Sequence, residues 1–179
     1  MTKKLFFDTD CLSSFLWVKQ ENLLLRLYPG KIVVPNEVAD ELSNPCLPHI
    51  KRRLSYLCSS GQFEKKQLLY GSQESKLFFE MITNPVMNVA LIGKGEAAAL
   101  SLAKVYKGII ASNNIKGIVY YVEKWELEHI TTAEILVEAK CMGLIDEYDG
   151  NIIWEDMLVK KRSLPAITFT DYIKGSEKN

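Results

Sequence analysis

The sequence predicts an α/β fold, a three-layer α/β/α sandwich around a central parallel sheet of about four to five strands. Short apolar runs alternate along the chain with longer segments of helical periodicity, which is typical of parallel strands joined by helices. Two of these runs, residues 4–7 and 108–112, end at polar side chains. The 179 residues with 47% hydrophobic content suffice for one domain with a substantial core.

In the first half of the chain, the predicted strands are short apolar runs, and the predicted helices carry apolar residues three or four positions apart. Pro and Gly mark several of the boundaries, because they favour turns. Residues 63–70 have no clear period and fit either a strand or an insertion. The predicted elements are a strand at 4–7, a helix at 12–28 broken near Gln20, a strand at 32–34, a helix at 36–42 capped by Asn36, and helices at 48–58 and 72–83.

The second half continues the alternation and ends in a helical extension from about residue 146. We expect one domain over residues 1–174, followed by a disordered tail at 175–179. The predicted elements are a helix at 96–106, a strand at 108–112, a helix at 114–124, a strand at 127–130, a helix at 132–142 capped by Thr131 or Thr132, and helical pieces at 150–162 and 169–173.

The charge balance and the cysteine pattern argue against some classes of protein. Lys and Arg together number 22, as do Asp and Glu, so the formal net charge is zero. This balance argues against bulk electrostatic capture of nucleic acid but leaves room for a local basic patch. The four cysteines show no C-x-x-C spacing, and neither histidine is near one in sequence. The pattern favours buried free thiols in a reducing compartment over a zinc site or a disulfide scaffold.

The apolar runs are too short for membrane insertion. Only Leu5-Phe6-Phe7 stands between the N-terminal lysines and Asp8, which is too short for a signal peptide. No apolar run approaches the roughly 20 residues that a bilayer-spanning helix needs. We therefore expect a cytoplasmic protein with no membrane partner.

Four stretches of the chain place polar side chains at a strand end or a helix start. They are Phe7-Asp8-Thr9-Asp10, Val34-Pro35 through Glu41-Leu42, Gly93-Lys94-Gly95-Glu96, and Ala111-Ser112-Asn113-Asn114. The carboxyl ends of parallel strands meet at one edge of a sheet, where ligands gather. Carboxylates there suit Mg²⁺, a hard cation that takes oxygen ligands and retains several waters. Such ions activate water for attack on a phosphodiester and neutralise the charge that develops.

In order and spacing, these stretches resemble the PIN-domain family, the ribonuclease fold of VapC-type toxins from bacterial toxin–antitoxin pairs. The family's D-T-x-x-L is matched by residues 8–12, and its strand, Pro and glutamate-bearing helix by residues 32–42. Its G-x-G-E helix start is matched by residues 93–96. Its last motif, Ser or Thr with an acidic pair, is replaced here by Ser112-Asn113-Asn114. The similarity covers about residues 4–145.

The resemblance implies a Mg²⁺- or Mn²⁺-dependent endoribonuclease that cleaves an RNA substrate and pairs with a cognate antitoxin protein. A metal-held water would attack the phosphorus, so no protein nucleophile is needed. Glu37 shares a helix face with Glu41, but the family pattern selects Glu41 and leaves Glu37 as a solvated acid. The implied catalytic and metal-binding residues are Asp8, Glu41 and Glu96, with Asn114 and Asp10 assisting.

The resemblance also implies a homodimer, because toxins of this family commonly form one. Helices near Trp17 and Trp154 carry apolar side chains that suit such an interface. The same tryptophans also suit a core, and the sequence leaves both interpretations open.

Several of the implied ligands also have a structural explanation. Asp10 is a candidate N-cap, Glu96 is favoured in a first turn by the helix dipole, and Asn113 and Asn114 suit a turn and a helix cap. An amide oxygen at position 114, where the family usually has Asp, can ligate a metal but brings no charge. The alternative function is a catalytically weakened PIN scaffold that binds RNA or a protein without cleavage. A nucleotide-binding α/β domain is a third interpretation, but it lacks a glycine fingerprint.

Overall fold

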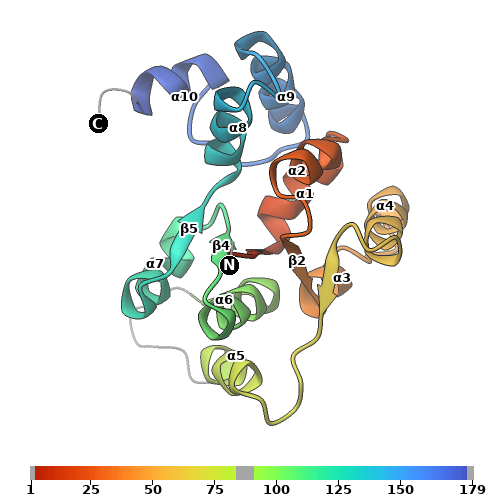
Figure 1. Ribbon diagram of the computed structural model, residues 1–179, viewed down its shortest axis with the longest axis vertical. Coiled ribbons are helices and arrows are strands. Elements are labelled where there is room, and N and C mark those ends of the chain that lie inside the picture. Colours follow the sequence, from red (N-terminus) through yellow and green to blue (C-terminus); the bar gives the residue numbers. More distant parts are fainter. Residues whose placement is uncertain (1–2, 84–90, 177–179) are drawn as a thin grey trace.

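The computed structural model describes residues 3–83 and 91–176. Over these residues the chain folds around a sheet of five parallel strands, which confirms the predicted α/β class (Figure 1). The strands lie in the order β3-β2-β1-β4-β5. Their bounds are β1 (Leu5–Phe7), β2 (Ile32–Pro35), β3 (Glu64–Lys66), β4 (Ile109–Ala111) and β5 (Glu128–Ile130).

Helices connect the strands and cover both faces of the sheet. The break expected near Gln20 is confirmed, because α1 ends at Trp17 and Lys19 adopts a left-handed φ of 60° before α2 begins. None of the helices in residues 3–83 and 91–176 is long and apolar enough to cross a membrane. The helices are α1 (Thr9–Trp17), α2 (Glu21–Leu27), α3 (Asn36–Glu41), α4 (Pro48–Ser59), α5 (Gln73–Thr83), α6 (Lys94–Tyr106), α7 (Ile115–Trp125), α8 (Thr132–Cys141), α9 (Glu147–Val159) and α10 (Phe169–Ser176).

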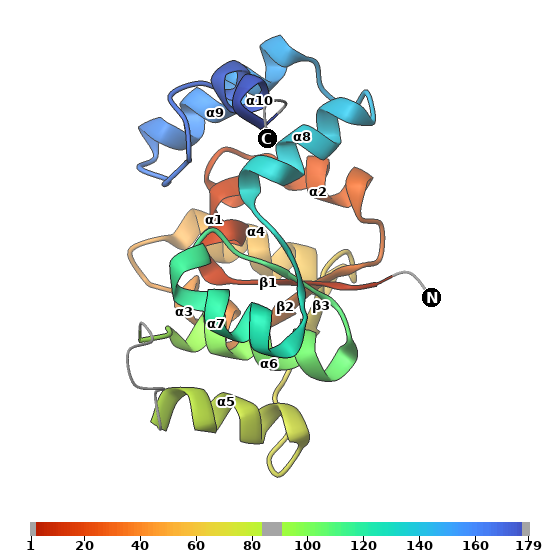
Figure 2. The ribbon, with the colours of Figure 1, turned by 90° about the vertical axis from the view of Figure 1, so that its left-hand side faces the viewer.

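The three inner strands, β2, β1 and β4, are apolar on both faces because each face packs against helices. Successive strand residues point to opposite faces, so Leu5 and Phe7 enter one core and Phe6 enters the other. The first core includes buried residues of α1, α2, α4, α8, α9 and α10, and the second includes those of α5, α6 and α7. Figure 2 shows these two groups of helices on opposite sides of the sheet, which is the expected three-layer arrangement.

The strand order reverses next to β1. From β1 the chain builds outward through β2 and β3, and then crosses back to place β4 on the other side of β1. Beyond the paired residues, the Asp8 amide donates to the Ala111 carbonyl at 2.9 Å, which holds the carboxyl ends of β1 and β4 together. Open parallel sheets bind ligands at such a switch point, outside the carboxyl ends of the strands. The fold therefore directs attention to Asp8 and to residues 112–114.

Two segments of the first half differ in detail from expectation. Residues 63–70 contain a strand, β3, at the edge of the sheet, and its charged residues discourage pairing with another chain. Asn36 does not cap α3, because Pro35 occupies the N-cap position and no side chain caps this helix.

The exposure of the cysteines and the end of the chain also need correction. All four cysteines are free, but Cys46 and Cys141 are exposed and only Cys11 is fully buried, so the expected burial is wrong for those two. The helix α10 extends through Ser176, so the predicted tail at 175–179 begins within a helix. Residues 177–179 of that tail lie outside the described part of the chain.

Trp154 belongs to the core and fixes α10 against α9. Its side chain is 1% exposed, its Nε1 donates to the Ala166 carbonyl at 3.1 Å, and its ring lies 5.8 Å from the Phe169 ring and 5.6 Å from that of Tyr172. Trp17 is half-buried against His49. Trp154 therefore offers no free surface for the expected homodimer.

Replacing Trp154 with Ala tests this packing. Because the substitution removes a buried aromatic ring and leaves a cavity, we expect it to lower the free energy of unfolding by about 3–5 kcal/mol. Val159→Ala on the same helix is the matched control, since Val159 is 69% exposed, and its expected effect is within about 0.5 kcal/mol. Urea denaturation followed by circular dichroism measures both. Equal small effects would mean that α10 does not dock on Trp154.

Candidate functional site

The Asp8 carboxylate lies fully buried at the end of β1. It caps α1, because its Oδ1 accepts a hydrogen bond from the Cys11 amide at 2.7 Å. Its other oxygen, Oδ2, is buried and has no hydrogen-bond partner of normal geometry among the described residues. Burial, with smaller contributions from Glu96 and Asp10, raises the pKa of Asp8 to about 7, although the Ser112 hydroxyl and the Cys11 amide act in the opposite direction. Near neutral pH the Asp8 carboxyl group is therefore protonated in part of the molecules.

Asp10 lies on the more open side of the same helix start and meets two donors. Asn113 Nδ2 donates to its Oδ2 at 3.0 Å, and Arg162 Nη1 lies 3.4 Å from its Oδ1. Asp8 rather than Asp10 is the N-cap of α1, so that structural explanation of Asp10 is wrong. Arg162 follows α9, and its place beside Asp10 could not be predicted from the sequence, because a contact across 152 residues leaves no local signal.

Glu41, the last residue of α3, is held against the start of α6. Its Oε1 accepts from the Gly95 amide at 2.9 Å, and its Oε2 accepts from the Thr9 hydroxyl. A Cβ at position 95 would lie only 2.9 Å from Glu41 Oε2 and 3.2 Å from Val38 Cγ2. The glycine of the G-x-G-E stretch therefore lets α3 and α6 approach closely enough to share this carboxylate.

Glu96 lies in the first turn of α6 and makes two contacts, one with the start of its own helix and one with Asn114. Its Oε2 accepts from the Gly93 amide at 3.1 Å, which satisfies a free donor at the helix start. Its Oε1 accepts from Asn114 Nδ2 at 2.8 Å. Glu96 therefore stabilises the first turn of α6 and also lies beside the strand ends.

Asn114 turns its amide nitrogen, not its oxygen, toward the acids. Its Oδ1 accepts from the Gly117 amide at 3.1 Å and caps α7, so Nδ2 is the group that faces Glu96. Asn113 behaves similarly: its Oδ1 accepts from the Thr132 amide at 2.9 Å while its Nδ2 faces Asp10. Both asparagines make the turn and cap that the sequence allowed, and both also donate to a carboxylate.

Together these residues form a hollow, which we call the acidic hollow, at the carboxyl edge of the sheet. It encloses about 210 Å³. It brings together Asp8, Asp10, Glu41 and Glu96, and Asn114 reaches it through Glu96. Its lining residues are Asp8, Thr9, Asp10, Ser13, Glu41, Gly93, Glu96 and Arg162.

Glu37 lies outside the acidic hollow. It lines a neighbouring hollow with Asp40 and Phe79, and burial raises the pKa of its carboxyl group. Its Oε2 is buried without a hydrogen-bond partner among the described residues. The expectation of a fully solvated acid at this position is therefore wrong.

The acidic hollow has the chemistry of a hard-cation site, but its side chains do not surround a cation. Carboxylate oxygens are the ligands that Mg²⁺ and similar ions prefer. Seven of the eight carboxylate oxygens already accept a hydrogen bond, and Asp8 Oδ2 is the exception. Within the described ranges, no three or more His, Cys, Asp or Glu side chains are grouped so as to hold a metal ion. A metal ion held here would use Asp8 Oδ2, and ligation by Glu41 or Glu96 would require each to give up a hydrogen bond.

Comparison with known proteins adds no relative. The chain matches no protein-family model and no curated protein.

The raised pKa of Asp8 predicts how stability depends on pH. Asp8 has a pKa of about 7 in the folded protein against 3.8 for the ordinary group, so the folded state holds this proton more tightly. Its contribution to the free energy of unfolding therefore falls as pH rises from about 4 to 7 and stays low above that range. Asp8→Asn removes this titration, so we expect the variant to exceed wild type by roughly 2–4 kcal/mol at pH 8 and to differ little at pH 4.5.

Urea denaturation at both pH values measures the difference between the two proteins. Asp156→Asn is the matched control, because Asp156 is exposed on α9 and should leave the pH dependence unchanged. Parallel stability profiles for wild type and Asp8→Asn would show that Asp8 is not the buried titrating group.

Proposed function

We propose that this protein is a Mg²⁺- or Mn²⁺-dependent endoribonuclease of PIN type. The observation that carries the proposal is the buried Asp8 carboxylate, whose Oδ2 accepts no hydrogen bond of normal geometry among the described residues, in a hollow that Asp10, Glu41 and Glu96 also line. A buried, unpaired carboxylate oxygen is unfavourable, and a cation is the partner that relieves it best at neutral pH. The order of the four sequence motifs supports the same proposal.

The residues of the acidic hollow divide into metal-binding and phosphate-binding groups. Asp8 would hold the metal ion through Oδ2, and Glu41 and Glu96 would join it after turning away from their amide donors. A bound ion of this kind supplies an activated water and neutralises charge on the phosphate. Arg162 lines the same hollow, and its planar guanidinium is suited to hold and orient an RNA phosphate.

The biological role that we propose rests on the family resemblance alone. The protein would be the toxin of a toxin–antitoxin pair, act in the cytoplasm and form a homodimer. A neighbouring reading frame that encodes a small DNA-binding protein with an acidic or apolar tail would support this assignment.

A second function, a PIN scaffold that binds RNA or a protein without cleavage, is favoured by the donors in the acidic hollow. Asn114 donates to Glu96, Asn113 donates to Asp10, and Arg162 lies beside Asp10. These contacts satisfy the carboxylates without a metal ion, and each must weaken before those oxygens can ligate one. The two functions therefore differ in whether metal displaces these donors.

Cleavage of single-stranded RNA by the purified protein in Mn²⁺ separates the two functions. We expect wild type to cleave and Asp8→Asn to be at least about 100-fold slower, because the variant loses the charge at its free oxygen. Asp156→Asn, with the same chemical change at an exposed position, should keep the wild-type rate. Equal residual rates for wild type and Asp8→Asn, with RNA binding retained, would favour the scaffold.

Asn114→Asp tests the missing charge. The substitution keeps the cap on Gly117 but replaces a donor to Glu96 with a second carboxylate. We expect Mn²⁺ to bind at least about 10-fold more tightly, because an added negative charge at short range attracts the ion. Without metal, repulsion between the two acids should lower the melting temperature.

Calorimetric titration with Mn²⁺ and thermal melts in a chelator measure the two effects. Asn114→Ser is the control, since Ser also caps helices but brings no charge. Mn²⁺ affinity that is the same for Asn114→Asp and Asn114→Ser would place residue 114 outside the metal's reach.

A further inference from the structure

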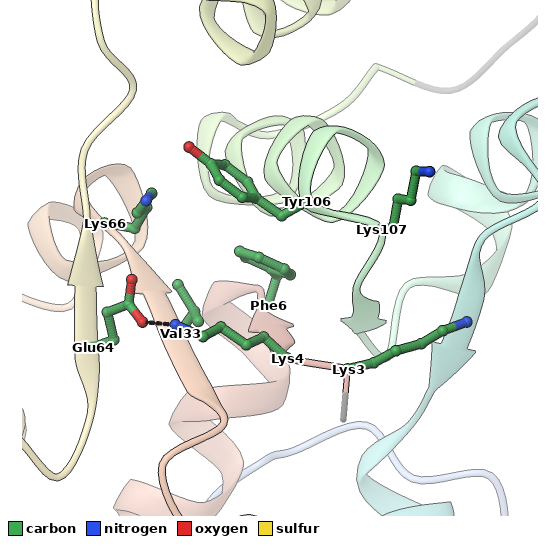
Figure 3. Close-up of a pocket in the computed structure, with 8 residues that line it drawn as sticks. All are labelled: Lys3, Lys4, Phe6, Val33, Glu64, Lys66, Tyr106 and Lys107. Carbon is green, nitrogen blue, oxygen red and sulfur yellow. Dashed lines mark hydrogen bonds and ion pairs between the residues drawn. The ribbon is translucent and has the colours of Figure 1, made fainter. Parts of the chain in front are cut away.

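A second hollow, which we call the basic hollow, lies over β1, β2 and β3 on the face that packs against α6 (Figure 3). It encloses about 570 Å³, within the range of small-molecule sites. Four lysines and one glutamate surround an apolar floor, whereas the chain as a whole has no net charge. The lining residues are Lys3, Lys4, Phe6, Val33, Glu64, Lys66, Tyr106 and Lys107.

The floor of the basic hollow is aromatic. Phe6 is buried beneath it, and its ring stacks on that of Tyr106 with centroids 6.2 Å apart and an interplanar angle of 28°. Tyr106 is 47% exposed, so part of its ring is open to a ligand. Lys66 Nζ lies 4.4 Å from the centre of that ring. A cation over an aromatic face is a weak contact at an exposed site, and an anion would readily draw it away.

Two of the four lysines keep their charge unpaired. Lys3 Nζ lies 2.6 Å from Glu128, and Lys4 pairs with Glu64. Within residues 3–83 and 91–176, no carboxylate lies within ion-pair distance of Lys66 or Lys107. In Figure 3 these two lysines stand on opposite sides of Phe6 and Tyr106, and the amino group of Lys107 is turned away from the two rings.

The basic hollow is separate from the acidic hollow. Gly93 and Glu96 at the start of α6 line the acidic hollow, whereas Tyr106 and Lys107 at its end line the basic one. A helix of 13 residues is about 20 Å long, so the two hollows do not share a ligand the size of one nucleotide.

Lys66 and Lys107 each have a structural role, but neither role accounts for the basic hollow. Lys107 ends α6 in a left-handed conformation, where a cation balances the roughly half negative charge of the helix end. Lys66 lies on the edge strand β3, where charge discourages aggregation. Neither role requires a concave aromatic surface between the two lysines. Because the helix end carries only about half a negative charge, a net positive charge remains after Lys107 balances it.

We propose that the basic hollow binds a planar aromatic anion of the nucleoside monophosphate class. The base stacks on the open part of the Tyr106 ring, as bases stack on exposed aromatic side chains. The phosphate draws Lys66 off that ring and pairs with it, while Lys107 on the other side of the floor adds a second positive charge to the hollow. Inorganic phosphate alone leaves the aromatic floor unused, and a nucleoside alone leaves the lysines unused, so both bind more weakly.

Calorimetric titration of the full chain with AMP in EDTA tests the proposal without any metal at the acidic hollow. The expected result is one site with a dissociation constant below about 1 mM. Adenosine and inorganic phosphate, titrated separately, should each bind at least about 10-fold more weakly. The other three nucleoside monophosphates are expected to bind within about 10-fold of AMP, because stacking is tolerant of base identity.

Variants locate the site. Lys66→Gln combined with Lys107→Asn should weaken AMP at least about 10-fold, and Asn is chosen because it tolerates the left-handed backbone at position 107. Tyr106→Leu should weaken AMP but leave phosphate unchanged. Lys51→Gln, a change at an exposed lysine of α4, and Asp8→Asn in the acidic hollow should both bind AMP as wild type does.

Melting temperatures of the variants establish that they fold. No AMP binding up to 5 mM, which is roughly five times the weakest expected dissociation constant, would overturn the proposal. Affinity unaffected in the double-lysine variant, or phosphate as tight as AMP, would also overturn it. Loss of AMP binding in Asp8→Asn would instead assign the nucleotide to the acidic hollow.

Discussion

A single backbone hydrogen bond, from the Asp8 amide to the Ala111 carbonyl at 2.9 Å, joins the strand ends on which the acidic hollow depends. It continues the β1–β4 pairing by one residue, at the point where the strand order reverses. The Ser112 amide donates to the Ile130 carbonyl at 3.0 Å in the same way, which aligns the end of β4 with that of β5. These two bonds hold the start of α1 beside the 112–114 turn, so that Asn113 can reach Asp10.

The alignment has an electrostatic consequence, because it buries Asp8 near other carboxylates. Hydrogen bonds satisfy Asp10, Glu41 and Glu96 at both oxygens. Within the described part of the chain, Asp8 accepts one hydrogen bond of normal geometry, from the Cys11 amide, and none at Oδ2. The pKa of Asp8 is raised chiefly because the carboxyl group is buried. Proteins retain such unfavourable groups mainly where function uses them, and a buried acid with a free oxygen is a ready cation ligand. The donors around Asp10, Glu41 and Glu96 oppose metal ligation, and this balance is what distinguishes the two proposed functions, nuclease and scaffold.

Much of the fold could be predicted because its signals are local. Short apolar runs that end in a polar residue mark β1 and β4, and parallel strands bring their carboxyl ends to one edge, so Asp8 and residues 112–114 could be placed together from the sequence. The second glycine of the G-x-G-E stretch has a steric reason, because a Cβ at position 95 would lie only 2.9 Å from Glu41 Oε2. Residues 63–70 were ambiguous because the edge strand β3 is too short and too charged to show a period.

The rest depends on contacts that leave no local pattern. Arg162 reaches Asp10 only because α8 and α9 pack above the sheet, and the basic hollow gathers residues from positions 3 to 107. The orientation of Asn114 could not be predicted either, because it is set by the cap on Gly117 and by Glu96 together. Trp154 was equally suited to a core or an interface until the position of α10 was known.

A crystal of the protein soaked in Mn²⁺ tests most directly whether the acidic hollow is a cation site centred on Asp8. Anomalous scattering locates the ion without assumptions about the protein. We expect a peak within about 2.0–2.4 Å of Asp8 Oδ2, with Glu41 or Glu96 turned toward it. No peak in the hollow at saturating Mn²⁺, or a peak bound only by exposed carboxylates elsewhere, would contradict it.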